Sequence, residues 1–136
     1  MEKKVLIVDD EPSVGELLRD FFARFQHGHQ YEISTALDGA EALMLLLRQP
    51  FDLVLLDIHM PRLSGLALLK EMRGLRIKVP VLMLTGNQDA KVAADAITAG
   101  VLAYVPKPFD LPQLEHLVAL ALPRRQRAPG GAAATG

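Results

Sequence analysis

Five short apolar segments, separated by stretches with helical periodicity, constrain the fold of this chain most strongly. The clearest are Val5–Val8, Leu53–Leu56 and Pro80–Leu84, which are too short for helices and are bounded by polar residues. Two further strands are predicted at Tyr31–Thr35, whose alternating polar residues indicate a sheet edge, and at Leu102–Val105. Strands alternating with helices predict one α/β domain, a parallel sheet covered by helices on both faces, because parallel neighbours need crossover connections.

The segments between these strands predict five helices. Ser13 is the expected N-cap of the first helix, and Asp38 opens the second, which Pro50 ends. The other three are expected around Leu68–Met72, over Asn87–Ala99 and over Asp110–Leu122. Beyond this point the chain becomes basic and then rich in Gly and Ala, which predicts a domain over residues 1–122 and a disordered tail or linker over residues 123–136.

Composition excludes several classes of protein. The chain has no cysteine, so disulfides and thiolate metal sites are ruled out. The first apolar segment is only four residues long, far short of a signal-peptide core or a membrane span. A net charge of -1 provides no overall attraction to nucleic acid or to anionic membranes. We therefore expect a cytoplasmic protein, and no DNA-binding motif follows the last predicted helix.

Acidic residues follow two of the predicted strands where each strand ends. Asp9 and Asp10 come directly after the first strand, and Asp57 comes directly after the third. The carboxyl ends of parallel strands meet at one edge of the sheet, so these three carboxylates should lie close together. They would repel one another without a cation, and Mg²⁺ prefers oxygen ligands such as these. The sequence therefore predicts a magnesium site.

The same edge carries residues suited to phosphoryl transfer. With a metal bound, Asp57 keeps a free oxygen that can attack phosphorus and form an aspartyl phosphate. Lys107 follows the fifth strand and can pair with phosphoryl oxygens as a point charge. Thr85 can donate its hydroxyl to the same group, and Gly86 leaves room for it.

Four motifs carry a family resemblance. They are the segments Val8–Pro12, Leu56–Gly65, Leu84–Gly86 and Lys107–Phe109, which occur in this order between residues 3 and 122. The chain resembles the receiver domain of bacterial two-component response regulators, in particular the single-domain, chemotaxis-regulator-like members. This resemblance implies a flavodoxin-like (βα)5 fold of strand order 2-1-3-4-5. It also implies a phosphohistidine donor on a sensor histidine kinase or a histidine phosphotransfer protein.

The resemblance assigns roles to individual residues. It makes Asp57 the phosphoacceptor and adds the backbone carbonyl of His59 to the magnesium ligands Asp9, Asp10 and Asp57. It makes Lys107 the phosphate-binding lysine and implies a cis peptide bond between Lys107 and Pro108. The remaining roles are those of Thr85 as the switch hydroxyl, Tyr104 as the aromatic that turns inward on activation, and His59 and Asn87 as residues that tune the access of water.

The output implied by the resemblance is a change of surface. Phosphorylation would alter the face formed by the fourth helix, fifth strand and fifth helix, at Asp89–Ala99, Leu102–Val105 and Leu111–Leu122. Such a change requires that the phosphoryl group shift the difference in free energy between two conformations of this face. The target would be a partner protein, or a second copy in a phosphorylation-dependent homodimer. Such a protein is a phosphoacceptor that catalyses its own phosphotransfer and autodephosphorylation, without being an enzyme in the ordinary sense.

Three other functions compete with this interpretation. A phosphatase of the haloacid dehalogenase type would need an acid two residues after its nucleophile, where His59 stands. A flavodoxin-type electron carrier would bind a flavin phosphate at the first loop, which the acidic residues at 9–11 would repel. A receiver that has lost phosphorylation and acts only as a binding module is the third, although all five functional positions hold competent residues.

Overall fold

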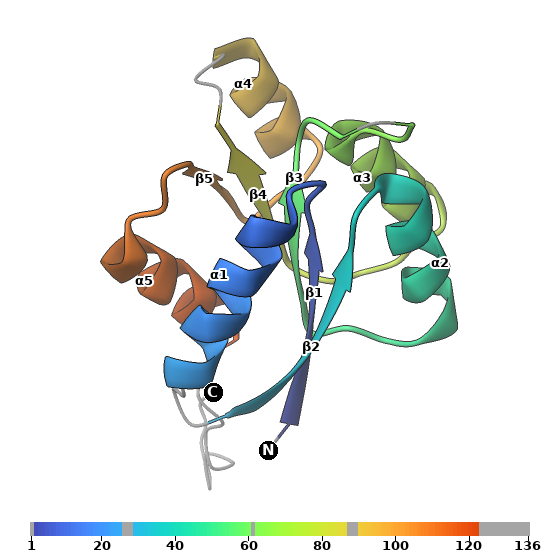
Figure 1. Cartoon of the computed structure of the whole chain (residues 1–136). Helices are drawn as coiled ribbons and strands as arrows, with labels where there is room; N and C mark the ends of the chain where they lie inside the picture. The colour runs from blue at the N-terminus through green and yellow to red at the C-terminus, as the bar shows by residue number, and fades with distance from the viewer. Residues whose placement is uncertain (1, 26–28, 61, 87–89, 123–136) are drawn as a thin grey trace, which may run out of the picture.

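The computed structural model of the chain describes residues 2–25, 29–60, 62–86 and 90–122. Five parallel strands form one sheet of order β2-β1-β3-β4-β5 (Figure 1), as predicted. The strands are β1 (Glu2–Val8), β2 (Gln30–Ala36), β3 (Leu53–Asp57), β4 (Val81–Thr85) and β5 (Ala103–Pro106). The helices are α1 (Pro12–Arg24), α2 (Gly39–Arg48), α3 (Gly65–Gly74), α4 (Ala90–Thr98) and α5 (Leu111–Ala121). The predicted tail at residues 123–136 and Asn87 lie outside the described residues.

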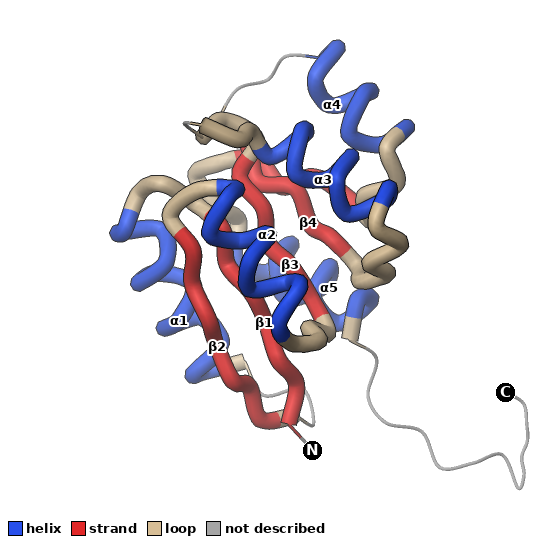
Figure 2. The backbone as a smooth tube through the Cα atoms, turned by 90° about the vertical axis from the view of Figure 1, so that its right-hand side faces the viewer, coloured by secondary structure: helices blue, strands red, loops and turns tan. Residues whose placement is uncertain are grey.

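The central strands are apolar on both faces because helices cover both. Figure 1 shows α1 and α5 on one side of the sheet and α2 and α3 on the other, and Figure 2 looks onto the latter side. In β3, Leu53 and Leu55 pack with the α1 and α5 side, while Val54 and Leu56 pack with the other. Because successive side chains of a strand point to opposite faces of the sheet, this one apolar run contributes to both hydrophobic cores.

Helix starts follow the local chemistry, with one exception to the predictions. Asp38 accepts a hydrogen bond from the Glu41 backbone N–H at 2.8 Å and caps α2, as expected. The prediction that Ser13 caps α1 is wrong, because the helix begins at Pro12 and Glu11 occupies the N-cap position without a side-chain cap bond. Proline suits the first helical position, since its missing N–H would have no partner there.

The strand registers bring the predicted site residues to one edge of the sheet. Val8 pairs with Leu56 and Asp57 pairs with Leu84, so the ends of β1, β3 and β4 are level. Thr85 pairs with Pro106, which places the end of β5 beside them. Among the helices that the structure describes, none has the length and apolar character needed to span a lipid bilayer.

Candidate functional site

Three carboxylates meet where β1 and β3 end. Asp9, Asp10 and Asp57 each offer one oxygen atom, and these atoms all lie within 4.8 Å of one another. Asp9 and Asp57 are almost fully buried, at 2% and 4% exposure, whereas Asp10 faces solvent. Two buried acids beside an exposed third form a cluster with one side open to water, as the strand-end argument predicted.

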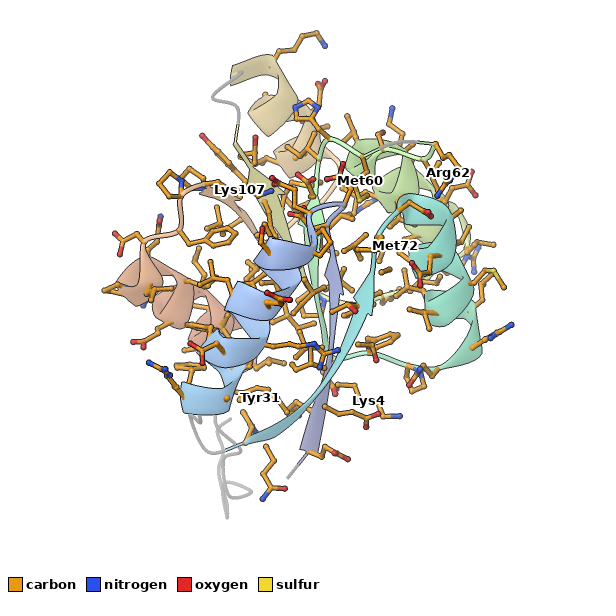
Figure 3. The ribbon with its side chains drawn as sticks, viewed as in Figure 1. Lys4, Tyr31, Met60, Arg62, Met72 and Lys107 are labelled. Atoms are coloured by element: carbon orange, nitrogen blue, oxygen red, sulfur yellow. The ribbon has the colours of Figure 1, made fainter. Side chains whose placement is uncertain are left out.

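A lysine from the end of β5 supplies the positive charge in this cluster. Lys107 Nζ lies 2.7 Å from Asp9 Oδ2 and 3.7 Å from Asp57 Oδ1. Figure 3 shows its side chain reaching from β5 toward the ends of the central strands. The peptide bond between Lys107 and Pro108 is cis, and the Lys107 backbone N–H donates to the Thr85 carbonyl at 2.7 Å. The hydrogen bond to Thr85 anchors the backbone from which the Lys107 side chain extends.

The electrostatics of the cluster favour a bound cation. Burial, and then the charge of Asp9, raise the pKa of the Asp57 carboxyl to about 6, against the opposing effect of Lys107. Burial acts to lower the pKa of Lys107, but the hydrogen bond to Asp9 and the charges of Asp57, Asp9 and Glu11 outweigh it, so its pKa is raised. The shift at Lys107 thus reflects the carboxylates around it, whereas the shift at Asp57 reflects burial first and the charge of Asp9 second.

The other predicted site residues differ in their exposure and in their distance from the cluster. Thr85 is 3% exposed and directly follows Leu84, the strand partner of Asp57. The His59 backbone N–H donates to Asp57 Oδ1 at 3.4 Å, while its ring is exposed. Tyr104 in β5 is 36% exposed, so its ring lies on the surface in this structure. Tyr104 thus stands apart from the buried cluster.

Several residues of the site were not predicted from the sequence. Glu11 Oε1 lies 3.5 Å from Lys107 Nζ, and its backbone N–H donates to Asp9 Oδ1 at 2.9 Å. Gly65 packs so closely that a Cβ there would lie 2.0 Å from the Asp57 carbonyl oxygen. The position of Glu11 next to Asp9 and Asp10 is the feature of the sequence that could have indicated its place in the site. Gly65 lay within the motif segment Leu56–Gly65, but the sequence does not show how closely its backbone approaches Asp57.

The loop after Asp57 is also fastened to α2. Arg62, whose φ of 65° is left-handed, forms an ion pair with Asp38, the N-cap of α2. Hydrogen bonding to the Glu41 backbone, followed by the bond to Arg62, holds the pKa of Asp38 below its usual value. A Cβ at Gly39 would lie 2.4 Å from the carbonyl oxygen of Leu63 in this loop. These contacts hold the loop that follows Asp57 against the start of α2.

The donor set fits Mg²⁺. It consists of carboxylate oxygens on rigid strand ends, with an open side for water, and it contains no sulfur or imidazole ligand among the described residues. Hard oxygen donors with room for several waters match the coordination that Mg²⁺ prefers. The group that carries the chemistry is then a carboxylate next to a cation site and an ammonium group.

This fold and site define a class: α/β domains that hold acids and a lysine at the carboxyl edge of a five-stranded parallel sheet. The profile of the response regulator receiver domain matches residues 5–119. The chain therefore belongs to the response regulator receiver domain family. Members are phosphoacceptor signalling modules that interact with histidine kinases and downstream targets, and they typically use Mg²⁺ at an acidic pocket.

Similar proteins support the same assignment. The chain is 39% identical over 119 residues to the regulatory protein AtoC of Escherichia coli, covering 88% of this chain and 25% of AtoC. It is 37% identical to the response regulator MprA of a Mycobacterium species, covering 84% of this chain and 48% of MprA. The chain thus spans between a quarter and a half of these curated relatives. The solved structure of the chemotaxis protein CheY4 of Vibrio cholerae superposes with a TM-score of 0.79 at 28% identity, covering 90% of this chain and all of that one.

Proposed function

We propose that Asp57 accepts a phosphoryl group from a phosphohistidine on a sensor histidine kinase or a histidine phosphotransfer protein. The observation that carries this proposal is a buried carboxylate at a strand end, next to two further acids and 3.7 Å from the ammonium group of Lys107. Burial, and then the charge of Asp9, raise the pKa of this carboxyl to about 6, and carboxyls perturbed in this way cluster at functional sites.

The transfer is a substitution at phosphorus. An Asp57 carboxylate oxygen forms the new bond to phosphorus, the bond from phosphorus to the imidazole nitrogen breaks, and that nitrogen keeps the electron pair. The histidine then takes a proton from solvent. In autodephosphorylation, water attacks phosphorus, the carboxylate leaves as the anion, and inorganic phosphate and a proton are released.

Asp9, Asp10 and Asp57, with the backbone carbonyl of His59, would hold the Mg²⁺ ion. When bound, the ion supplies charge neutralisation for the phosphoryl oxygens. Lys107 would leave its 2.7 Å bond to Asp9 and pair with a phosphoryl oxygen on the other side. Its ammonium group already lies 3.7 Å from Asp57 Oδ1, the carboxylate that would carry the phosphoryl group.

Thr85 and Tyr104 would report phosphorylation to the surface. The Thr85 hydroxyl, at the end of β4, is one residue beyond the partner of Asp57 and would donate to the phosphoryl group. Tyr104, exposed on the neighbouring strand, would then turn inward. The face formed by α4, β5 and α5 would change in this way and engage a downstream protein, or a second copy of the domain. His59, beside Asp57, and Asn87, outside the described residues, would set how long the signal lasts.

The phosphodonor would dock on the exposed side of α1. Glu16, Arg19 and Asp20 are exposed there, and the first two line a cavity of about 320 Å³ that extends to Asp9 and Glu11. This cavity therefore joins the helix surface to the acid cluster. Charged residues around such an approach help to select partners more than they add affinity.

The alternative function is that of a receiver that binds a partner without being phosphorylated.

The experiment that tests the proposal is intact-mass measurement after incubation with acetyl phosphate, with and without Mg²⁺. We expect the gain of one phosphoryl group by the native protein only when Mg²⁺ is present, and no gain by Asp57→Asn. Asp110→Asn is a matched control, because asparagine can keep the N-cap bond of α5 and the site is untouched. A folded native protein that gains no phosphoryl group from acetyl phosphate or from a phosphorylated kinase would favour the binding module.

A further inference from the structure

A basic-rimmed cavity lies at the opposite end of β4 from the acid cluster. It has a volume of about 330 Å³ and is bordered by the end of α3, the loop into β4 and the turn before β5. Its residues are Leu69, Met72, Arg73, Arg76, Ile77, Lys78, Val79, Val81 and Gly100. Val81 is the first residue of β4 and Thr85 the last, so this cavity and the phosphoacceptor edge are separate surfaces.

The cavity combines an apolar floor with a positive rim. Leu69, Met72 and Val81 are buried at its base, whereas Arg73, Arg76 and Lys78 are exposed around it. No acid is among the described residues that line it, and neither Arg76 nor Lys78 forms an ion pair within the described ranges. Three cations without acidic partners favour an anionic ligand.

Arg73 is held in place by the turn that follows α4. Its Nη1 donates to the Ala99 carbonyl at 2.6 Å, and it lies so close to Gly100 that a Cβ at that glycine would be 2.1 Å away. A guanidinium group held in this way loses little further freedom when it binds a carboxylate. One of the three cations is therefore already oriented.

Arg76 occupies a backbone position at which glycine is usual. It follows the C-cap Leu75 of α3 and has a left-handed φ of 59°. Its N–H donates to the Arg73 carbonyl and that of Ile77 to the Met72 carbonyl, at 3.1 and 2.9 Å, which is the helix-ending motif that favours glycine. A side chain that is kept here at the expense of backbone strain points to a use for its charge.

We propose that this cavity binds a short acidic segment of a partner protein. One large apolar side chain of the segment fills the space above Met72, and carboxylates on either side of it face Arg76 and Lys78. The volume lies at the lower end of the range of about 300–1,000 Å³ for small-molecule sites and suits a single side chain. The cations stand on the rim, where flanking carboxylates of a peptide reach them.

The test is fluorescence anisotropy with a labelled peptide of sequence Asp-Glu-Phe-Leu-Glu-Asp and the full chain. We expect saturable binding that weakens as salt rises, and no binding of a peptide with lysines in place of the acids. Arg76→Gly should weaken binding by about two- to fivefold, the size of an exposed ion pair, and so should Lys78→Ala. Arg76→Gly should also raise the urea midpoint or leave it unchanged, because glycine relieves the left-handed strain. Loss of binding could not then come from unfolding.

Arg62→Gly is the matched control. Arg62 has the same left-handed backbone, with a φ of 65°, but it pairs with Asp38 and does not line this cavity. Equal weakening by Arg62→Gly and Arg76→Gly would overturn the proposal, as would equal binding of the lysine peptide. Saturable binding of phenylacetate, followed by NMR chemical shifts, without binding of the acidic peptide would assign the cavity to a small organic anion and also overturn it.

Discussion

Replacing Asp57 with asparagine should stabilise the metal-free protein. Burial and the neighbouring Asp9 raise the pKa of this carboxyl from 3.8 to about 6 in the folded state. Between these two values the folded state binds more protons than the unfolded state, so stability falls as pH rises through this window. Above about pH 6 the full penalty is present in the native protein, and asparagine, which cannot ionise, removes it.

The size of the gain follows from the same pKa values. A carboxyl whose pKa rises from 3.8 to about 6 on folding lowers the free energy of unfolding by about 3 kcal/mol once it is ionised in both states. The conversion is about 1.4 kcal/mol per pKa unit. Water at the open side of the cluster screens part of this, so we expect Asp57→Asn to gain about 1–3 kcal/mol at pH 7.5. The gain should shrink toward zero as the pH approaches 4.

Urea unfolding followed by circular dichroism, in EDTA, measures this directly at several pH values. Asp10→Asn is the control, because it removes the same charge from the exposed member of the cluster and should give a smaller gain. Added Mg²⁺ should stabilise the native protein and narrow its difference from Asp57→Asn. An Asp57→Asn variant that is no more stable than the native protein at pH 7.5, or a gain that does not change with pH, would refute the electrostatic reasoning.

Three further predictions concern the scaffold of the site. Gly65→Ala should destabilise the fold by about 1–3 kcal/mol and slow phosphorylation by acetyl phosphate, because the added Cβ meets the Asp57 carbonyl oxygen at 2.0 Å. An unchanged free energy of unfolding together with an unchanged phosphorylation rate would contradict this prediction. Ser64→Ala should cost about 1 kcal/mol in urea unfolding, since Ser64 Oγ accepts from the Ala67 N–H at the start of α3, and Ser64→Asp should retain the stability. Leu55→Ala should cost about 2–5 kcal/mol, because this side chain is fully buried in the central strand, and a smaller loss would mean that the core collapses around the cavity.

The order of elements was predictable from the sequence because burial on both faces leaves an apolar run that ends abruptly. The run Leu53–Leu56 is the clearest case, and β3 contains all of it and ends one residue later, at Asp57. The first strand was harder, since β1 starts at Glu2 and not at Val5. Residues 2–4 are exposed or half-buried, and they belong to the strand only because β1 pairs with its neighbour β2 from Glu2 and Gln30 onward. This pairing is a long-range contact, which the local sequence pattern does not contain.

The acid cluster was predictable for a related reason. A carboxylate directly after a buried strand must lie at the strand's end, and parallel strands end together. Contacts between loops follow no such rule. The ion pair of Arg62 with Asp38 and the 3.5 Å approach of Glu11 to Lys107 depend on how separate loops turn, which the order of residues along the chain does not specify.

The ammonium group among the three acids lowers the negative charge that a bound cation meets. Asp9, Asp10 and Asp57 together with Lys107 leave two negative charges when all are ionised. A divalent ion balances these two charges, and the exposed Glu11 carboxylate, 3.5 Å from Lys107 Nζ, adds further negative charge at the edge of the site. Because Lys107 is part of the chain, one of the buried acid charges is already compensated before any ion binds.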